Sequence, residues 1–283
     1  MKRKLVSVIL PFFNGPKYTK MCLNSVLEYT RHPYELILID NGSKKEIKEY
    51  FKTQAARFEN VKIISNRKNL GAPKAFNQGI AASAGEYLLF LNNDTIVTDG
   101  WLSRLVGHIE RDSKIGIVGA GTNGVKNDCG DFPTCEGYRN EKEIQRTAAF
   151  VSLARRGEFK VVPTTTSFCM LTKREVIDRI GVFDESYGLG TNDDHDFCLR
   201  AREAYYKIIC AFDTLVFHFY NRTLGNLNVK KLDRRNREYF IWKFGERGLK
   251  FYEEIKQPYG TRGERPFEII RKINNRIPYY DKL

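Results

Sequence analysis

The chain has 283 residues, of which 42% are hydrophobic and 29% are charged. These proportions are typical of globular proteins and exclude a disordered chain or a collagen-like repeat. The formal net charge is +13, and the segment 222–283 contributes 16 Lys and Arg against 8 Asp and Glu. Two interpretations of this basic segment remain: a surface for an anionic partner (a lipid surface, a phosphorylated carrier or nucleic acid), or the solvated face of a helix.

The six cysteines are scattered and form no CxxC pair. This pattern predicts neither a disulfide framework nor a zinc knuckle, so we expect a reducing, cytoplasmic setting.

The N-terminus has two interpretations, a secretory signal peptide or a first buried strand. Its apolar stretch 5–13 contains Pro11 and no small-x-small cleavage site, which favours the strand. No apolar run reaches the ~18–20 residues of a membrane span.

Strand and helix signals alternate in the first half of the chain. Short apolar runs predict strands at 5–10, 34–39, 61–64 and 87–91. Between them we expect a helix that begins at Pro16, a polar helix at 44–58 and a helix at 72–82. Continuous apolar strands separated by helices predict an α/β fold with a Rossmann-like, mostly parallel central sheet and helices on both faces.

The second half is less regular. We expect a helix at 101–110, a strand at 115–118, a long loop at 120–138, a strand at 161–171 and another strand within 205–219. A basic amphipathic helix is predicted at 229–250, with aromatic residues on its apolar side. The chain therefore divides into an α/β domain at 1–225 and a basic, mainly helical C-terminal extension at 226–283.

Polar residues follow three of the predicted strands. Asn14 follows the first strand, Asp40-Asn41-Gly42-Ser43 the second, and Asn92-Asn93-Asp94 the fourth. In open α/β sheets, ligands bind at the carboxyl ends of the strands. One such cluster is explained by turn chemistry alone. Three clusters at one sheet edge favour a binding site.

Two acidic motifs indicate chemistry. Asp94 offers hard carboxylate oxygens, which suit Mg²⁺ or Mn²⁺ and the diphosphate that such an ion usually accompanies. Asp193, Asp194 and Asp196 lie together at the apparent start of a helix. A well-capped surface helix is one interpretation, but capping needs a single acid, whereas crowded carboxylates raise each other's proton affinity and so make a general base. His218 lies among aromatic residues, either as a core histidine or as a ligand.

The order of these motifs resembles that of the family 2 glycosyltransferases, which have the nucleotide-sugar-binding GT-A fold. The resemblance covers about residues 5–250. It is carried by Val8 to Asn14, Asp40 to Ser43, Asn69-Leu70-Gly71, Asn77-Gln78-Gly79, Gly85 to Thr95, Gly181 to Glu185, Asp193 to Asp196, His218 to Thr223, Asn236-Arg237 and Trp242 to Gly245.

The resemblance implies a role for each matching residue. The nucleotide-sugar donor would be bound by Pro11, Phe13, Asn14, Asp40, Asn41, Ser43, Asn69, Gly71, Lys74, Asn77, Asn92, Asn93 and Asp94, with Asp40 at the base. Asp94 and His218 would hold Mn²⁺ or Mg²⁺. Asp194 matches the catalytic base, with Asp193 beside it. Thr166, Ser167 and Phe168 would lie near the donor sugar, and Trp101 would pack in the core.

The resemblance thus implies an inverting, metal-dependent glycosyltransferase that moves a sugar from a nucleotide-diphosphate sugar, with UDP-sugar favoured. The acceptor would be a glycan, a lipid-linked glycan or a protein. We also expect a peripheral contact of the basic C-terminal region with anionic membrane at its inner face, and a homo-oligomer stays open.

Three other functions fit the sequence less well. A nucleotidyltransferase would need a glycine-rich phosphate loop, but the segment 11–16 has a single glycine. A dehydrogenase would need a GxGxxG motif at the first helix, and none is present. A catalytically inactive basic binding module for anionic lipid or nucleic acid fits the tail charge. Retention of Asp94, Asp193, Asp194 and His218 together argues against that module, and nucleic acid is not the expected partner.

Overall fold

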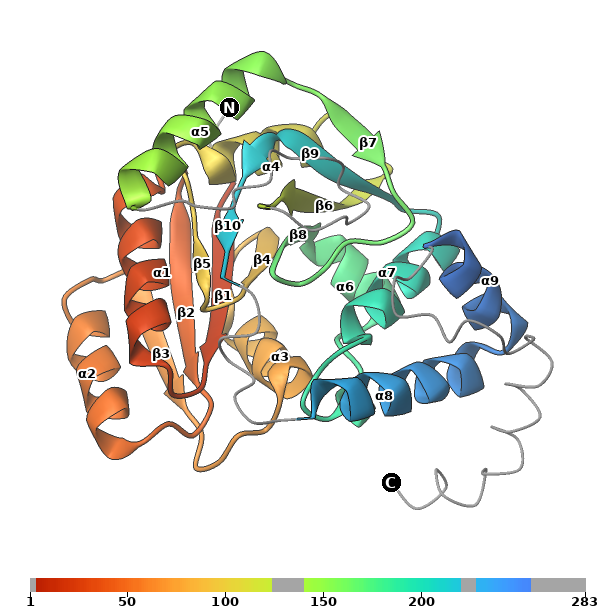
Figure 1. The fold of residues 1–283 in the computed structure, drawn as a ribbon, viewed down its shortest axis with the longest axis horizontal. Coiled ribbons are helices and arrows are strands. Elements are labelled where there is room, and N and C mark those ends of the chain that lie inside the picture. The colour runs from red at the N-terminus through yellow and green to blue at the C-terminus, as the bar shows by residue number, and fades with distance from the viewer. Residues whose placement is uncertain (1–3, 124–139, 220–227, 256–283) are drawn as a thin grey trace.

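The computed structural model describes residues 4–123, 140–219 and 228–255. Its centre is an eight-stranded sheet in the order β3-β2-β1-β4-β8-β6-β9-β7 (Figure 1). The strands are β1 (Val6–Phe12), β2 (Tyr34–Asp40), β3 (Val61–Ser65), β4 (Tyr87–Leu91), β6 (Ile115–Gly121), β7 (Phe159–Val161), β8 (Cys169–Lys173) and β9 (Lys207–Leu215). Only β7 and β8 run against their neighbours within this sheet, so the prediction of a mostly parallel sheet is confirmed.

Helices cover both faces of the sheet, as the apolar strands predicted. Along β1, Val8 and Leu10 point into one core layer and Ile9 into the other. The first layer lies under α1 (Pro16–Tyr29), α2 (Lys45–Ala55) and α4 (Trp101–Ile109). The second lies under α3 (Ala72–Ala82), α6 (Arg174–Ile180) and α7 (Asp193–Glu203). Trp101 is fully buried in the first layer, as expected.

Two predicted elements are wrong in extent. The strand expected at 161–171 is two strands, because β7 ends at Val161 and β8 begins only at Cys169. Val162 N–H still bonds to Ile208 O, and Pro163, which has no backbone N–H to donate, follows it and ends the pairing. The helix expected at 229–250 is two helices, α8 (Val229–Phe244) and α9 (Glu246–Glu254). Gly245 separates them with φ of +58°, a conformation that ends a helix.

Several elements lacked a sequence prediction. The helix α5 (Glu141–Ala154) lies over β9, and a small separate sheet pairs β5 (Thr95–Ile96) with β10 (Phe217–His218). A short 3₁₀ turn, η1 (Glu185–Tyr187), precedes α7. Most of the loop expected at 120–138 lies outside the described residues. Within the part of the chain that the structure describes, none of the helices combines the length and apolar character that a bilayer crossing requires.

Candidate active site

The carboxyl ends of β1 and β2 are held together by their own polar residues. The Asn14 N–H donates to Ser43 Oγ at 2.9 Å, and Lys44 N–H donates to Asn14 Oδ1 at 3.1 Å. Asp40 is fully buried and accepts a hydrogen bond from Ser43 N–H at 2.9 Å. Its other oxygen, Oδ2, lies 3.6 Å from Lys48 Nζ and has no hydrogen-bond partner among the described residues. That oxygen retains the capacity to accept a hydrogen bond from a ligand.

Asn41 holds the loop that follows β3. Its amide donates to Asn69 Oδ1 at 2.9 Å and to Gly71 O at 3.1 Å. Its Oδ1 accepts from Leu70 N–H at 3.0 Å and from the Asn66 amide at 3.1 Å. These bonds shape the loop beside the strand ends. Donor contacts by Asn41, Asn69 and Gly71 stay a prediction, as do those by Pro11 and Phe13 at the end of β1.

Two predicted donor-binding residues on α3 contact the chain just before α7. Asn77 accepts from Phe183 N–H at 3.0 Å and donates to Phe183 O at 2.9 Å. Lys74 Nζ forms an ion pair with Glu185 at 3.1 Å. Both residues therefore fix the segment 183–185 against α3, in addition to any contact with the donor.

The loop after β3 also touches the segment that leads into α7. Gly71 has a φ of +89°, and a Cβ placed on it would lie 1.9 Å from the carbonyl oxygen of Gly188. Ala72 N–H bonds to Leu189 O. Only glycine permits this approach, because the conformation is left-handed and a side chain would overlap the neighbouring backbone. The two loops thus meet at Gly71 and Gly188.

The residues after β4 face different directions. Asn92 N–H donates to Phe168 O at 2.9 Å, which joins the strand end to the segment before β8. The Asn93 amide donates to Thr19 Oγ1 on α1 at 2.8 Å. Asp94 is 3% exposed. The three residues predicted to contact the donor are therefore positioned by backbone and α1 contacts, with Asp94 next to the small β5–β10 sheet.

Asp94 and His218 lie together, although 124 positions separate them in the sequence. The β5–β10 pairing aligns His218 with Thr95, the residue after Asp94. His218 Nε2 lies 3.0 Å from Asp94 Oδ1, and the Phe168 ring stacks on the imidazole at 5.2 Å. The structure thus brings together the two residues predicted to be metal ligands.

The geometry of this pair fits a divalent ion. Two neighbouring ligands that are each about 2.1 Å from an octahedral ion lie about 3 Å apart, which is the separation of Asp94 Oδ1 and His218 Nε2. Among the described residues, no group of three His, Cys, Asp or Glu side chains is placed to enclose a metal. The pair alone would therefore leave several coordination positions for water and for diphosphate oxygens.

Three aspartates crowd the first turn of α7. Asp194 accepts from His195 N–H at 2.9 Å, and its Oδ2 lies 3.4 Å from Ser167 N. Asp193 is buried, and its Oδ2 has no hydrogen-bond partner in the described part of the chain. Burial, together with the charges of Asp194 and Asp196, raises the pKa of Asp193 well above its usual range. Such crowding exceeds what helix capping requires.

The segment that carries these acids is strained and is held from the C-terminal helix. Thr191 and Asn192 have φ of 71° and 61°, a conformation that costs free energy in residues other than glycine. The buried amide of Asn236 on α8 contacts the carbonyls of Gly190 and Thr191, and that of Asn192 donates to Asp233 Oδ1 at 2.9 Å. Helix α8 thus supplies the bonds that keep this segment in place.

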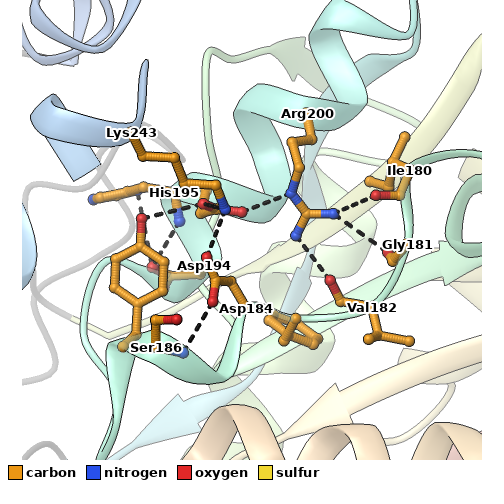
Figure 2. A network of polar contacts seen from close by, with 12 residues as sticks. Ile180, Gly181, Val182, Asp184, Ser186, Asp194, His195, Arg200 and Lys243 are labelled. Atoms are coloured by element: carbon orange, nitrogen blue, oxygen red, sulfur yellow. Dashed lines mark hydrogen bonds and ion pairs between the residues drawn. The ribbon is translucent and has the colours of Figure 1, made fainter. Parts of the chain in front are cut away.

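Lys243, also on α8, adds a charged link to the same segment (Figure 2). Its Nζ lies 2.6 Å from Asp184 Oδ2 and 2.6 Å from Asp196 Oδ2. Arg200 Nε binds the other oxygen of Asp196 at 2.6 Å. Burial alone would raise the pKa of Asp184, but Lys243 and Ser186 N–H lower it to about 2. Asp196 is fully buried, so the two cations neutralise its charge.

The sequence did not assign a site role to Asn236 or Lys243. Their spacing of seven residues places them on one face of α8, and this spacing is a signal that could have indicated their shared contact. Both residues belong to the C-terminal motifs that carry the family resemblance, but the resemblance implied no function for either.

A comparison with protein families agrees with this geometry. The model of the family described as “Glycosyl transferase family 2” matches residues 7–181, more than half of the chain. The chain belongs to glycosyltransferase family 2. Its matched part begins in β1, includes Asp40 and Asp94, and ends just before the segment that leads into α7.

Curated relatives of this family 2 glycosyltransferase are also similar in sequence. It is 27% identical to the glycosyltransferase AglE of Haloferax volcanii over 239 residues. The aligned part covers 84% of this chain and 74% of AglE. It is 28% identical to the glycosyltransferase GlyG of Streptococcus pneumoniae over 116 residues. That aligned part covers 41% of this chain and 38% of GlyG. The chain therefore spans well under half of GlyG.

Solved structures establish the fold of this family 2 glycosyltransferase as GT-A. GalNAc-T7, crystallised with UDP, GalNAc and Mn²⁺, superposes with a TM-score of 0.65 at 20% identity, covering 96% of this chain and 55% of that chain. The mannosyltransferase PcManGT of Pyrobaculum calidifontis, in complex with GDP-Man and Mn²⁺, superposes with a TM-score of 0.61 at 16% identity, covering 97% of this chain and 70% of that chain. The predicted fold is confirmed.

Proposed function

We propose that this glycosyltransferase is inverting and metal-dependent, with Asp194 as the base and Asp94 and His218 as the metal ligands. One observation carries the proposal: the adjacent residues Ser167 and Phe168 contact both parts of the site. Ser167 N lies 3.4 Å from Asp194 Oδ2, and the Phe168 ring stacks on His218. The base and the metal-binding pair are therefore separated by little more than two residues of backbone.

In this mechanism, Asp194 accepts the proton of an acceptor hydroxyl while the hydroxyl oxygen bonds to the anomeric carbon of the donor sugar. The bond between that carbon and the diphosphate oxygen breaks, and the electron pair leaves with the nucleoside diphosphate. Because one displacement occurs, the configuration at the anomeric carbon inverts. Mn²⁺ or Mg²⁺ held by Asp94 and His218 would neutralise charge on the diphosphate.

The donor proposed is a UDP-sugar. Asp40 carries a buried oxygen with no hydrogen-bond partner among the described residues, at the strand end where the nucleotide base would lie. Such an oxygen suits the ring N–H of a uracil base. GalNAc-T7 was crystallised with UDP and PcManGT with GDP-Man, so chains of this fold bind either nucleotide and the proposal of UDP rests on the Asp40 oxygen. The acceptor proposed is a glycan, a lipid-linked glycan or a protein.

We also propose a reducing, cytoplasmic setting. The cysteines that the structure describes, Cys22, Cys169, Cys198 and Cys210, are all buried, and no disulfide joins any two of them. Burial raises the pKa of Cys22 and of Cys198 to about 12, so these thiols are protected from oxidation.

A calorimetric titration tests the donor and the metal together. The diphosphates of uridine, thymidine, guanosine and cytidine are each titrated with and without Mn²⁺. We expect UDP to bind in the presence of Mn²⁺, and His218→Ala to weaken that binding by about tenfold or more while leaving metal-free binding unchanged. His32→Ala is the control, because this histidine bonds to Lys4 O just before β1, at the opposite end of that strand from Asn14. If a folded sample binds none of the four nucleotides, the proposal is wrong and the basic binding module gains support.

A further inference from the structure

The helix α5 carries apolar side chains on two opposite faces. On its inner face, Ala148 and Val151 are buried against Leu215 of β9. On its outer face, Phe150 is 68% exposed and Leu153 is 76% exposed. A surface helix of a globular protein normally presents polar side chains on its outer face. The exposure of two large neighbouring apolar side chains therefore marks this face as an interaction site.

The edge strand β7, which follows α5 in the chain, carries two further exposed apolar side chains. A short turn connects the end of α5 to β7, and both elements contact β9 (Figure 1). Phe159 and Val161 on β7 are 40% and 57% exposed. In the described part of the chain, seven large apolar side chains are exposed. Four of them thus lie within a segment of twelve residues. We call Phe150, Leu153, Phe159 and Val161 the α5–β7 surface.

Basic side chains surround this surface. The exposed charged residues of the segment 141–161 are four cations (Lys142, Arg146, Arg156 and Lys160) and one acid (Glu158). The guanidinium of Arg111, on the neighbouring helix α4, lies 5.5 Å from the centre of the Phe159 ring. On the outer face of α5, Lys142 and Arg146 precede the apolar residues, with the half-buried Glu143 between them. Apolar side chains flanked by Lys and Arg are the combination that binds an anionic membrane interface.

We propose that the α5–β7 surface docks on an anionic lipid bilayer. Phe150 and Leu153 would enter the headgroup region, and Arg146 and Arg156 would contact lipid phosphates. A second copy of the chain fits less well, because a twofold interface would place the same cations against each other. The β7 strand, with three residues, also offers few backbone groups for pairing with another chain.

This surface differs from the C-terminal region that the sequence indicated. In the described part of α8, Asn236 and Lys243 face the segment 184–192 and are used within the protein. The exposed cations at the start of α8, Lys230 and Lys231, have no large exposed apolar neighbour on that turn. They therefore provide the charge control for the experiment.

Flotation of the full chain with lipid vesicles tests the proposal. The vesicles contain phosphatidylcholine alone, or phosphatidylcholine with about one-third phosphatidylglycerol. We expect binding to the anionic vesicles only, weakened by added salt. The variant Phe150→Ser/Leu153→Ser should lower vesicle affinity by about tenfold or more. The variant Arg146→Glu/Arg156→Glu should lower it by a similar factor, since each basic residue contributes about fivefold.

Two matched controls separate this surface from general effects. The variant Val182→Ser/Tyr205→Asn removes exposed apolar side chains elsewhere, and Lys230→Glu/Lys231→Glu removes exposed cations elsewhere. Both should bind vesicles as the unchanged chain does, and all variants should keep its circular dichroism spectrum. Three results would overturn the proposal: no binding of the unchanged chain to anionic vesicles, full binding by Phe150→Ser/Leu153→Ser, or a lipid-free dimer that this variant converts to a monomer.

Discussion

The ammonium group of Lys243 lies 2.6 Å from a carboxylate oxygen of Asp196, and this contact joins α8 to the first turn of α7. Asp196 is fully buried two positions after the proposed base, Asp194. The second contact of Lys243, with Asp184, fixes the segment that leads into α7 from the other side. Helix α8 therefore holds the segment of the proposed base in position, and Lys243 is a positioning residue.

Lys243→Met should destabilise the chain and slow turnover. The change leaves Asp184 without its cation and Asp196 with Arg200 alone, so the free energy of unfolding should fall by about 3 kcal/mol. We expect a lower kcat with KM for the donor nearly unchanged, and partial recovery of kcat in Lys243→Arg. Urea unfolding and steady-state kinetics measure these effects. Lys231→Met, on an exposed turn of α8, is the control. Equal unfolding free energies and equal kcat values for the two Met variants would exclude a positioning role for Lys243.

The Asp184–Lys243 contact should also appear in the pH dependence of stability. Lys243 and Ser186 N–H lower the pKa of Asp184 to about 2 in the folded chain, against about 3.9 in an unfolded chain. The stabilisation is therefore complete above about pH 4 and is lost as the pH falls through about 2. Urea midpoints measured across this range should fall less steeply in Lys243→Met. Parallel pH curves for the two proteins would contradict the assignment.

The parts of the fold that the sequence predicted are those with strong local patterns. The strands β1, β2 and β4 are buried on both faces, so each appears as a nearly continuous apolar run, broken only by Ser7 in β1 and Glu35 in β2. Helix α5 was missed because Phe150 and Leu153 make its outer face apolar, which removes the contrast between buried and exposed positions. The β5–β10 sheet has strands of two residues, too short to carry a pattern.

The site was only partly predictable for a different reason. The contact between Asp94 and His218 depends on that short sheet, so spacing along the chain could not indicate it, and the family resemblance supplied the pair. The bonds of Asn236 to the carbonyls of Gly190 and Thr191 depend on the left-handed backbone of a loop, which no periodicity encodes. Tertiary packing, not local propensity, forms both.

Asp194→Asn should abolish most turnover while leaving donor binding intact. The amide has nearly the same shape as the carboxylate but cannot accept a proton, so kcat should fall by roughly 10²–10⁴-fold. Calorimetry with UDP and Mn²⁺ should give an affinity within about twofold of that of the unchanged chain, since a base in the proposed position would contact the acceptor and not the nucleotide. Unchanged kcat would mean that another group removes the proton.

Asp193→Asn should stabilise the chain at neutral pH. Burial and the neighbouring acids raise the pKa of Asp193, so its ionised form costs free energy in the folded state. This cost is present above the folded pKa and disappears below the unfolded pKa of about 3.9. The melting temperature should rise by about 2–4 °C at pH 7, the shift that ~1 kcal/mol produces in a chain of this size, and the gain should vanish near pH 4. A gain that is equal at both pH values would disprove this origin.

Gly71→Ala should separate the loop after β3 from the segment that leads into α7. The added Cβ would lie 1.9 Å from Gly188 O, and alanine would have to adopt a φ of +89°. Because backbone atoms cannot yield as a flexible side chain does, we expect the free energy of unfolding to fall by about 2–4 kcal/mol.

Gly107→Ala is the matched control: this glycine lies in α4, and nothing lies within 4 Å of its added Cβ. Alanine there should be neutral or stabilise by about 0.5–1 kcal/mol, because it is the better helix former. Where Gly71→Ala remains folded, its kcat should fall more than its affinity for UDP, since the displaced segment carries Asp194; a loss confined to UDP affinity would show that Gly71 serves the nucleotide alone.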